Sequence, residues 1–274
     1  MMASTRKLLA LAVLAVSLPA TSLPASAEGG LPLDRMSVDV RDAASLQAGA
    51  RDFVNYCLNC HSASMMRYNR LSDLGLTEEQ IKDNLLFTGD KVGAMMSVAM
   101  TRSDAKNWFG AAPPDLTVIA RTRGADWLYS YLRSFYRDPK TDTGWNNLVF
   151  ERVAMPHVLW TLQGQTILEV REFKTEHEAE AARIQEHRFA VLSEEGEGDA
   201  TRHILKTTRI DKAGQLTPAQ YDALVRDLVN YLVWMGEPAQ ETRKSIGIVV
   251  VLFLGLLLLP LTWLLKKAYW KDVH

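Results

Sequence analysis

Only two cysteines occur in this chain of 274 residues, and they lie three positions apart in the stretch NYCLNCHSA. His61 directly follows Cys57 and Cys60, which gives the spacing C-x-x-C-H. Two thiols at this spacing can form a reversible disulfide, supply half of a zinc site or bind a haem covalently. This choice constrains the fold more than any other feature, because each outcome needs a different scaffold around the motif.

Each alternative to haem lacks a requirement. A disulfide between these cysteines would close a loop too small to stabilise the chain much. A zinc site needs four ligands, and the sequence has no second C-x-x-C or H-x-x-x-H pair. A thioredoxin-like redox pair needs a βαβ setting, whereas the flanks of this motif have helical spacing. The motif therefore predicts one covalent haem c, with Cys57 and Cys60 as thioether sites and His61 as the proximal iron ligand.

The first 27 residues have the pattern of a secretory signal peptide. A basic pair precedes the apolar run LLALAVLAVSL, and a small-residue ASA site ends at Ala27. A first transmembrane anchor is the alternative, but the run is short and prolines follow it at once. We expect cleavage after Ala27 and export of the mature chain, which then starts at Glu28.

A second apolar segment, near the C-terminus, is long enough to cross a membrane. Residues 246–265 read IGIVVVLFLGLLLLPLTWLL without a charge, and about 20 apolar residues span a bilayer core as a helix. We predict a haem domain at 28–244, a transmembrane helix at 245–265 and a cytoplasmic tail at 266–274. Together with the signal peptide, this places the haem domain in the periplasm and the single-pass anchor in the inner membrane.

Charge excludes one class of partner. Lysine and arginine number 31, aspartate and glutamate number 32, and no basic run is longer than a pair. Nucleic-acid binding needs a basic patch or stripe, so we expect no nucleic-acid partner.

Two amphipathic helices are predicted on either side of the motif. Residues 42–57 place Leu46, Ala50, Phe53, Val54 and Cys57 on one helical face. Residues 217–238 begin with Thr217 as an N-cap and Pro218 at the first helical position. The apolar stripe of this second helix is Tyr221, Leu224, Val225, Leu228, Leu232 and Met235. Helices that bracket the motif suit a small, mainly α domain that wraps a haem.

A sixth iron ligand has to come from elsewhere in the chain, or the site stays open. The methionines between residues 65 and 100 lie so near the motif that the opposite haem face is hard for them to reach. Met155 lies far downstream in NNLVFERVAMPHVLW, where Pro156 stiffens the backbone. We predict Met155 as the distal ligand. His157 is the rival ligand, and a plain core role for Met155 is the further alternative.

The stretch GAAPPDLTVIARTRGADWLYSYLRSF, residues 110–135, supplies further candidates. Pro113 and Pro114 fix an extended backbone without amide donors, which suits the edge of a haem. We interpret Asp115 as a helix N-cap rather than a catalytic acid. Arg121 and Arg123 can each pair with a haem propionate, and spacing does not choose between them or exclude solvated arginines.

In order along the chain, these motifs resemble the cytochrome c1 family, the haem subunit of the ubiquinol–cytochrome c reductase (cytochrome bc1) complex of proteobacteria. The resemblance rests on CLNCH, APPDLT, GWNNLVFERVAMP, YDALVRDLVNYLVWMGEPA and the terminal WKDVH, and runs from about residue 39 to the end. It implies a class I cytochrome c-like haem domain with insertions. It also implies Cys57 and Cys60 as thioether sites, His61 and Met155 as iron ligands, and Arg123 as the propionate partner. It assigns no disulfide, and we interpret the acidic stretch 174–200 as a solvated hairpin or loop.

The resemblance implies an electron-transfer subunit and no catalysis by the isolated chain. A Rieske iron–sulfur protein would reduce the haem, a cytochrome c would oxidise it, and cytochrome b would be the partner in the membrane. A free-standing membrane-anchored cytochrome shuttle is one alternative. Co-purification with a cytochrome b would distinguish the complex subunit from this shuttle. A haem sensor or peroxidase is another; its open sixth site would bind carbon monoxide in the reduced protein.

Overall fold

The computed structural model of the protein describes residues 31–186, 189–196 and 201–269. The predicted signal peptide, the last five residues of the predicted tail and parts of the acidic stretch lie outside these ranges. The described residues from Pro32 onward belong to one compact unit.

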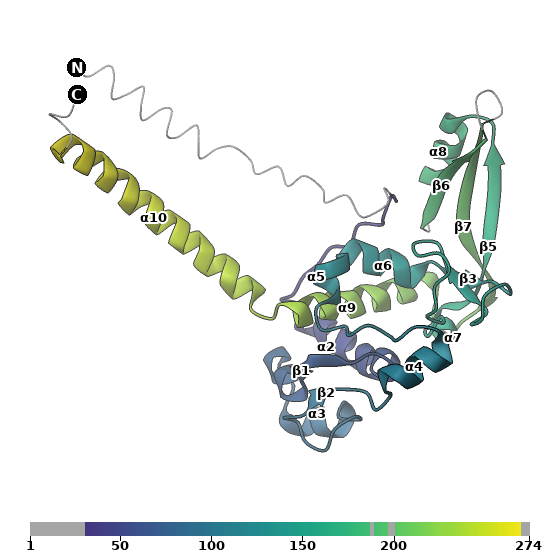
Figure 1. Ribbon diagram of the computed structural model, residues 1–274, viewed down its shortest axis with the longest axis horizontal. Helices are drawn as coiled ribbons and strands as arrows, with labels where there is room; N and C mark the ends of the chain where they lie inside the picture. The colour runs from purple at the N-terminus through teal and green to yellow at the C-terminus, as the bar shows by residue number, and fades with distance from the viewer. Residues whose placement is uncertain (1–30, 187–188, 197–200, 270–274) are drawn as a thin grey trace. The chain divides into compact units, whose positions relative to one another are not determined.

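The unit combines helices with a five-stranded sheet (Figure 1). Its first part forms α2 (Ala43–Asp52), η1 (Phe53–Cys57), β1 (Ala63–Arg67), η2 (Tyr68–Leu74), α3 (Glu78–Asn84), β2 (Met95–Met96), α4 (Arg102–Phe109), α5 (Ile119–Arg123) and α6 (Ala125–Arg133). Its second part forms β3 (Phe135–Arg137), β4 (Trp145–Asn147), α7 (Trp160–Gln163), β5 (Gly164–Phe173), α8 (Glu176–Gln185), β6 (Ala190–Glu195), β7 (Arg202–Ala213), α9 (Pro218–Gly236) and α10 (Gln240–Tyr269).

The crossing of α2 and α9 forms the centre of the helical core, and it confirms both predicted helices. Gly49 lies at the crossing, where a Cβ atom would stand 2.1 Å from the backbone oxygen of Asp227. Only glycine permits this approach of the two backbones. One turn further on, the rings of Phe53 and Tyr231 meet with their centroids 5.6 Å apart. The helix that leads into the cysteine motif is thereby anchored on α9.

α9 begins where the sequence predicted. The Thr217 side chain accepts a hydrogen bond from the Gln220 amide while the Gln220 side chain accepts one from the Thr217 amide, and Pro218 occupies the first helical position. The predicted apolar stripe is buried, with Leu224 only partly so. Burial extends around more of the helix than predicted, because α2, α5 and α6 all contact it.

The sheet corrects the mainly α prediction in part, while the class I cytochrome c-like arrangement stays a prediction. The strand order is β4-β3-β5-β7-β6, with β3 parallel to β5 and every other neighbouring pair antiparallel. β5 and β7 pair from Gly164 opposite Ala213 to Phe173 opposite His203. Burial along β7 does not alternate from residue to residue, so the period-two pattern that would have predicted a strand is missing.

The described residues of the acidic stretch 174–200 form a helix and a strand, where the sequence predicted a solvated hairpin or loop. α8 and β6 lie beside the far ends of β5 and β7 (Figure 1), and residues 172–204 are called the arm below. β6 pairs antiparallel with β7, so the hairpin is present. The helix α8 is an addition that the sequence did not predict, and its Ala179 is fully buried.

α10 contains the predicted transmembrane segment 245–265. Among the described residues it is the one helix long and apolar enough to cross a membrane, and its apolar side chains are exposed. Pro260 lies inside the helix without ending it, as is tolerated in lipid when the surroundings satisfy the freed carbonyl.

Candidate haem site

Cys57 and Cys60 lie in the turn that ends η1. The amides of Cys60 and His61 both donate to the carbonyl oxygen of Cys57, at 3.1 and 2.9 Å, which closes the motif into one turn. Neither cysteine is in a disulfide. Burial raises the pKa of the Cys57 thiol to about 12, which disfavours the thiolate that thiol exchange requires. The turn thus holds two thiols and an imidazole together, as covalent haem attachment requires.

A backbone carbonyl fixes the orientation of His61. The His61 Nδ1 atom lies 2.8 Å from the carbonyl oxygen of Pro114. Because that oxygen can only accept, Nδ1 carries the hydrogen and the lone pair of Nε2 is left to bind iron. Burial lowers the pKa of His61, which favours the neutral ring that a metal ligand needs. Pro114, predicted to line the haem edge, thus contributes a carbonyl that orients the proximal ligand.

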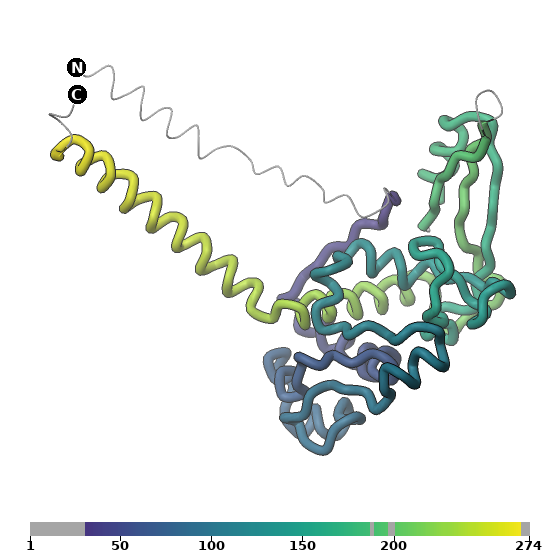
Figure 2. Tube along the Cα trace, viewed as in Figure 1, coloured from purple at the N-terminus to yellow at the C-terminus, as the bar shows by residue number. Residues whose placement is uncertain are grey.

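Asp115 fastens the loop that carries Pro114. This loop follows α4 and runs back beside β1 (Figure 2), where the Asp115 carboxylate accepts a hydrogen bond from the Ser64 amide at 2.8 Å. The same carboxylate accepts from the amide and the hydroxyl of Thr117, at 2.8 and 2.5 Å. Burial opposes the ionisation of Asp115, but these hydrogen bonds outweigh it and lower its pKa. The helix N-cap interpretation of Asp115 is wrong, because α5 begins after Val118.

Met155 lies in a loop that two buried asparagines hold in place. The side-chain oxygen of Asn147 accepts from two amides of this loop, at 2.8 and 3.1 Å. The side-chain oxygen of Asn146 accepts from the Arg152 amide at 2.9 Å, where the chain adopts a left-handed φ of 57°. The sequence predicted a rigid loop from Pro156 alone. The asparagine pair in GWNNL, a polar pair in an apolar setting, was the signal that we missed.

The sulfur of Met155 faces an aromatic row on α6. The Tyr131 hydroxyl donates a hydrogen bond to the Met155 Sδ atom at 3.4 Å. Tyr131 stacks on Trp127 and meets Phe135 edge to face, and burial raises the pKa of its hydroxyl. Sequence reasoning missed Tyr131. The signal available was the pair of aromatic residues four positions apart, Trp127 and Tyr131, which lie on one face of α6.

His157, the rival ligand, is a core residue. Its ring is stacked on Phe135 at 4.9 Å and packed edge to face against Trp145 at 5.1 Å. Its Nε2 atom lies 2.6 Å from the Gln163 side-chain oxygen, so Nε2 donates a hydrogen there and has no lone pair for iron. Burial lowers the pKa of His157 to about 4, and the ring stays neutral in the core. These contacts favour Met155 over His157.

The two candidate propionate partners lie in different surroundings. Arg121 is directed at the end of α9, where its guanidinium lies 3.7 Å from the Glu237 carboxylate. The guanidinium of Arg123 lies over the ring of Trp127, 5.1 Å from its centroid. Trp127 belongs to the aromatic row that reaches Met155. Arg123 is therefore the arginine of the pair on the side of the predicted distal ligand.

The donor set fits a c-type haem better than another metal. The candidate iron ligands are a fixed neutral imidazole and a thioether on a separate loop, a pair that is typical of cytochromes c of high potential. Within the described part of the chain, no three histidine, cysteine, aspartate or glutamate side chains gather as a metal cluster.

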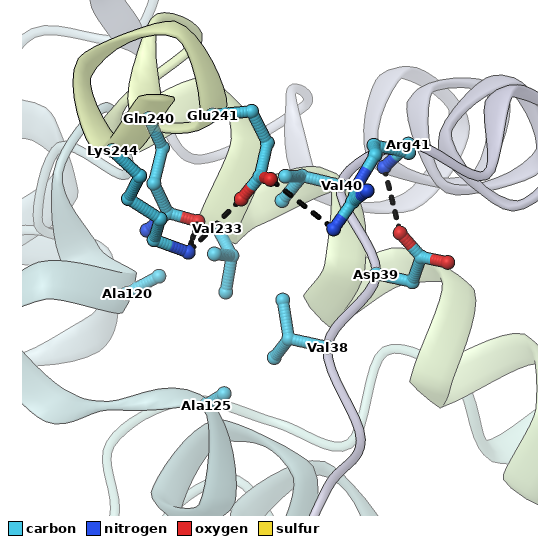
Figure 3. A pocket seen from close by; sticks show the side chains of 10 residues that line it. All are labelled: Val38, Asp39, Val40, Arg41, Ala120, Ala125, Val233, Gln240, Glu241 and Lys244. Carbon is cyan, nitrogen blue, oxygen red and sulfur yellow. Dashed lines mark hydrogen bonds and ion pairs between the residues drawn. The ribbon is translucent and has the colours of Figure 1, made fainter. Parts of the chain in front are cut away.

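A cavity at the base of α10 lies apart from this donor set. Its volume is about 400 Å³, and its walls come from residues 38–41 and from α5, α6, α9 and α10 (Figure 3). On its rim, Glu241 pairs with Arg41 at 3.3 Å and with Lys244 at 2.9 Å. None of the predicted haem-binding residues lines this cavity, so it marks the junction of the body with the membrane helix.

The known proteins that resemble this chain include cytochromes c1 and one protein named as a subunit of a monooxygenase. The sequence model of the Cytochrome C1 family matches residues 35–171 and 205–273. The chain is 46% identical to a cytochrome c1 of Allochromatium vinosum, over 93% of this chain and 94% of that protein. It is also 46% identical to a protein of Nitrosomonas europaea named ammonia monooxygenase gamma subunit, over 88% of this chain and 89% of that protein. A cytochrome c1 of Rhodospirillum rubrum is 28% identical over 90% of each chain.

The gap in the family match coincides with the arm. Residues 172–204 lie between the two matched segments, and they contain α8, β6 and the far ends of β5 and β7. The haem motif, the Met155 loop, α9 and α10 all lie inside the matched segments. The arm therefore lies between the two segments that the family model matches.

Proposed function

The chain belongs to the cytochrome c1 family, and from this premise we propose that it accepts electrons from a Rieske iron–sulfur subunit and passes them to a cytochrome c. Proteins of this family carry one covalently bound haem c and serve electron transport in the cytochrome bc1 complex. The observation that carries the proposal is the C-x-x-C-H turn whose His61 is oriented by the Pro114 carbonyl. Cytochrome b, the Rieske protein and cytochrome c are the proposed partners.

The haem supplies a one-electron iron couple, and the chain's own residues set how that couple behaves. Cys57 and Cys60 would hold it covalently, so that it does not dissociate with each redox change. The Pro114 carbonyl holds the His61 ring in one tautomer, which keeps Nε2 directed at a single position. The Met155 thioether would favour ferrous iron and raise the potential, as an acceptor downstream of quinol requires. Ligands held in place by the chain on both sides would limit the reorganisation that accompanies each electron.

The membrane orientation belongs to the same proposal. We place the haem domain in the periplasm and residues 266–274 in the cytoplasm, with α10 crossing between them. Support comes from the length and composition of α10. Protease added to intact spheroplasts should digest the haem domain and spare a C-terminal tag; digestion of the tag alone would reverse the orientation.

Assembly is the test that separates a complex subunit from a free-standing shuttle. The native protein, extracted in mild detergent, should leave the membrane with a cytochrome b and a Rieske protein. Ubiquinol should then reduce its haem in a reaction that the purified chain alone does not perform. A chain that leaves the membrane without a cytochrome b, yet is reduced by ubiquinol in situ through another carrier, would contradict the proposal.

The name of the Nitrosomonas relative refers to a monooxygenase. A haem that took part directly in such a reaction, like the haem of a sensor or peroxidase, would need an open iron position. Carbon monoxide distinguishes these from a closed site, because it binds reduced haem only where the sixth position is free. The wild-type protein should not bind it at neutral pH. Met155→Leu should keep the haem, lower its potential and admit carbon monoxide. Met65→Leu, at a methionine that is 79% exposed, is the matched control and should behave like wild type.

A further inference from the structure

The sulfur of Met155 already has one partner before iron is considered. The Tyr131 hydroxyl donates to it across 3.4 Å, within the range of hydrogen bonds to sulfur. Tyr131 is 8% exposed and Met155 is half-buried, so water does not compete freely for either group. A thioether sulfur has two lone pairs. One that accepts this hydrogen bond leaves the other for a metal.

The surrounding residues hold the Tyr131 hydroxyl and the Met155 sulfur in place. The Tyr131 ring is stacked on Trp127 with centroids 4.7 Å apart and is met by Phe135 at 5.0 Å, so the ring cannot swing freely. Asn147 connects the two sides of the hydrogen bond. Its side-chain nitrogen donates to the Tyr131 carbonyl at 2.8 Å, while its side-chain oxygen holds the start of the Met155 loop. These contacts therefore fix the distance between the Tyr131 hydroxyl and the Met155 sulfur.

We propose that Tyr131 positions the Met155 thioether for iron and raises the haem potential through this hydrogen bond. The proposal rests on the proposed function, in which Met155 is the distal ligand. By occupying one lone pair, the hydroxyl directs the other toward the haem. By drawing electron density from the sulfur, it weakens the sulfur's donation to ferric iron more than to ferrous iron. Tyr131 is thus a positioning residue and does not itself bind the iron.

Tyr131→Phe removes the hydroxyl and keeps the ring, so it isolates the hydrogen bond. At a fixed ambient potential, the ratio of ferric to ferrous haem should rise measurably, by up to about tenfold, because the full contribution of one hydrogen bond is the upper limit of its difference between the two oxidation states. The near-infrared absorption that a thioether ligand gives to ferric haem should shift as well. Haem content should not change, because attachment depends on Cys57 and Cys60.

Two other tyrosine-to-phenylalanine variants serve as matched controls. Tyr129→Phe removes a hydroxyl from the same helix, where the ring packs under Arg133 and not against Met155. Tyr221→Phe removes a buried hydrogen bond to the Leu132 carbonyl, which has a distance of 2.8 Å, and should lower stability. Neither should move the redox ratio or the near-infrared band. A general loosening of the core is thereby separated from an effect on the sulfur.

A Met155→Lys background tests whether the effect passes through the sulfur. An amine that binds iron uses its only lone pair and cannot accept a hydrogen bond, so Tyr131→Phe should lose its redox effect there. An equal effect in both backgrounds, or a silent Tyr131→Phe in the wild type, would overturn the proposal. If Met155→Leu instead keeps the wild-type band and potential, the ligand assignment fails and this inference falls with it. A failed Tyr131 test leaves the proposed function intact. A Met155→Leu variant that behaves like wild type removes Met155 from the proposed function as the distal ligand.

Discussion

His61 is oriented by a residue 53 positions further along the chain, and that residue is positioned by hydrogen bonds of its own neighbour. Pro114 supplies the carbonyl, and Asp115 fastens the loop to Ser64 and Thr117. At the scale of single residues, the proximal side of the site is therefore a short chain of hydrogen bonds. A change in Asp115 should reach His61 only through the position of this loop.

Acid should weaken the contribution of Asp115 to stability. Its pKa in the folded protein is lowered from the ordinary 3.8, so the fold prefers the ionised form. That preference stabilises the fold above the unfolded value and is lost as the pH falls through the folded one. Asp115→Asn should cost about 0.5–1 kcal/mol at pH 7, a small value because the side chain is exposed. The difference from wild type should shrink below pH 3.8 in urea unfolding measured across the acid range.

Asp142→Asn is the control for the acid series. Asp142 is also exposed, so its removal changes the net charge by the same amount without touching the loop. A pH-independent penalty for Asp115→Asn would mean that shape, and not charge, accounts for the role of Asp115.

Arg123 and Arg121 should differ in their effect on the haem. Removal of a cation near a propionate leaves that carboxylate less compensated, which stabilises ferric iron and lowers the potential. We expect Arg123→Gln to lower the potential by about 30–60 mV. A tenfold change in a one-electron equilibrium constant corresponds to about 59 mV. Arg121→Gln, whose guanidinium is directed at Glu237, should leave it nearly unchanged in a redox titration. Equal effects of the two variants would remove Arg123 as the propionate partner.

At the scale of elements, the haem motif depends on how closely α2 approaches α9. The approach is set by Gly49, and it places Phe53 against Tyr231 just before the first cysteine of the motif. The arm, in contrast, has no part in the crossing that positions the haem motif. Its helix α8 has a buried alanine of its own, Ala179, but the arm lies outside the segments that match the family.

Gly49→Ala should destabilise the protein. The new methyl group would stand 2.1 Å from a backbone oxygen and 2.6 Å from the Tyr231 Cβ atom, so the two helices would have to move apart. Overpacking of this kind costs about 1–3 kcal/mol, and the melting temperature of the purified protein should fall by several degrees. Gly93→Ala is the control, because a methyl group there would meet nothing within 4 Å. A melting temperature equal to that of the control would show that the crossing tolerates the shift.

At the scale of the whole molecule, α10 does more in the proposed function than tether the haem domain. Tethering needs only apolar length, whereas docking on a cytochrome b needs shape, since helices in lipid associate through close packing and small residues. Gly247 and Gly255 lie eight positions apart and so near one face of the helix. A Cβ atom at either position would meet no other atom of this chain within 4 Å.

Replacement of residues 246–265 by polyleucine tests this difference. The variant should stay in the membrane with its haem, but quinol-dependent reduction of the haem should be lost. Membrane fractionation, haem staining and the rate of reduction by ubiquinol measure the three properties. A leucine span that keeps the two glycines should recover part of the activity. Normal turnover by plain polyleucine would make α10 a tether and assign docking to the haem domain.

Local patterns were predictable because they depend on residues adjacent in the chain. The C-x-x-C-H spacing, the Thr217–Pro218 start of α9, the apolar face of residues 42–57 and the apolar length of α10 all fall in this class. The sheet was not predictable from its pattern, because the burial of β7 does not alternate.

The sequence by itself determined the haem motif, the apolar anchor and the helices that flank the site. Only the tertiary structure decided that His61 is held by the Pro114 carbonyl, that His157 has Gln163 as its partner, and that Tyr131 reaches the sulfur of Met155. The physical reason is that a buried polar group takes the partner that packing brings to it. Where that partner comes from another segment of the chain, no local sequence pattern predicts it.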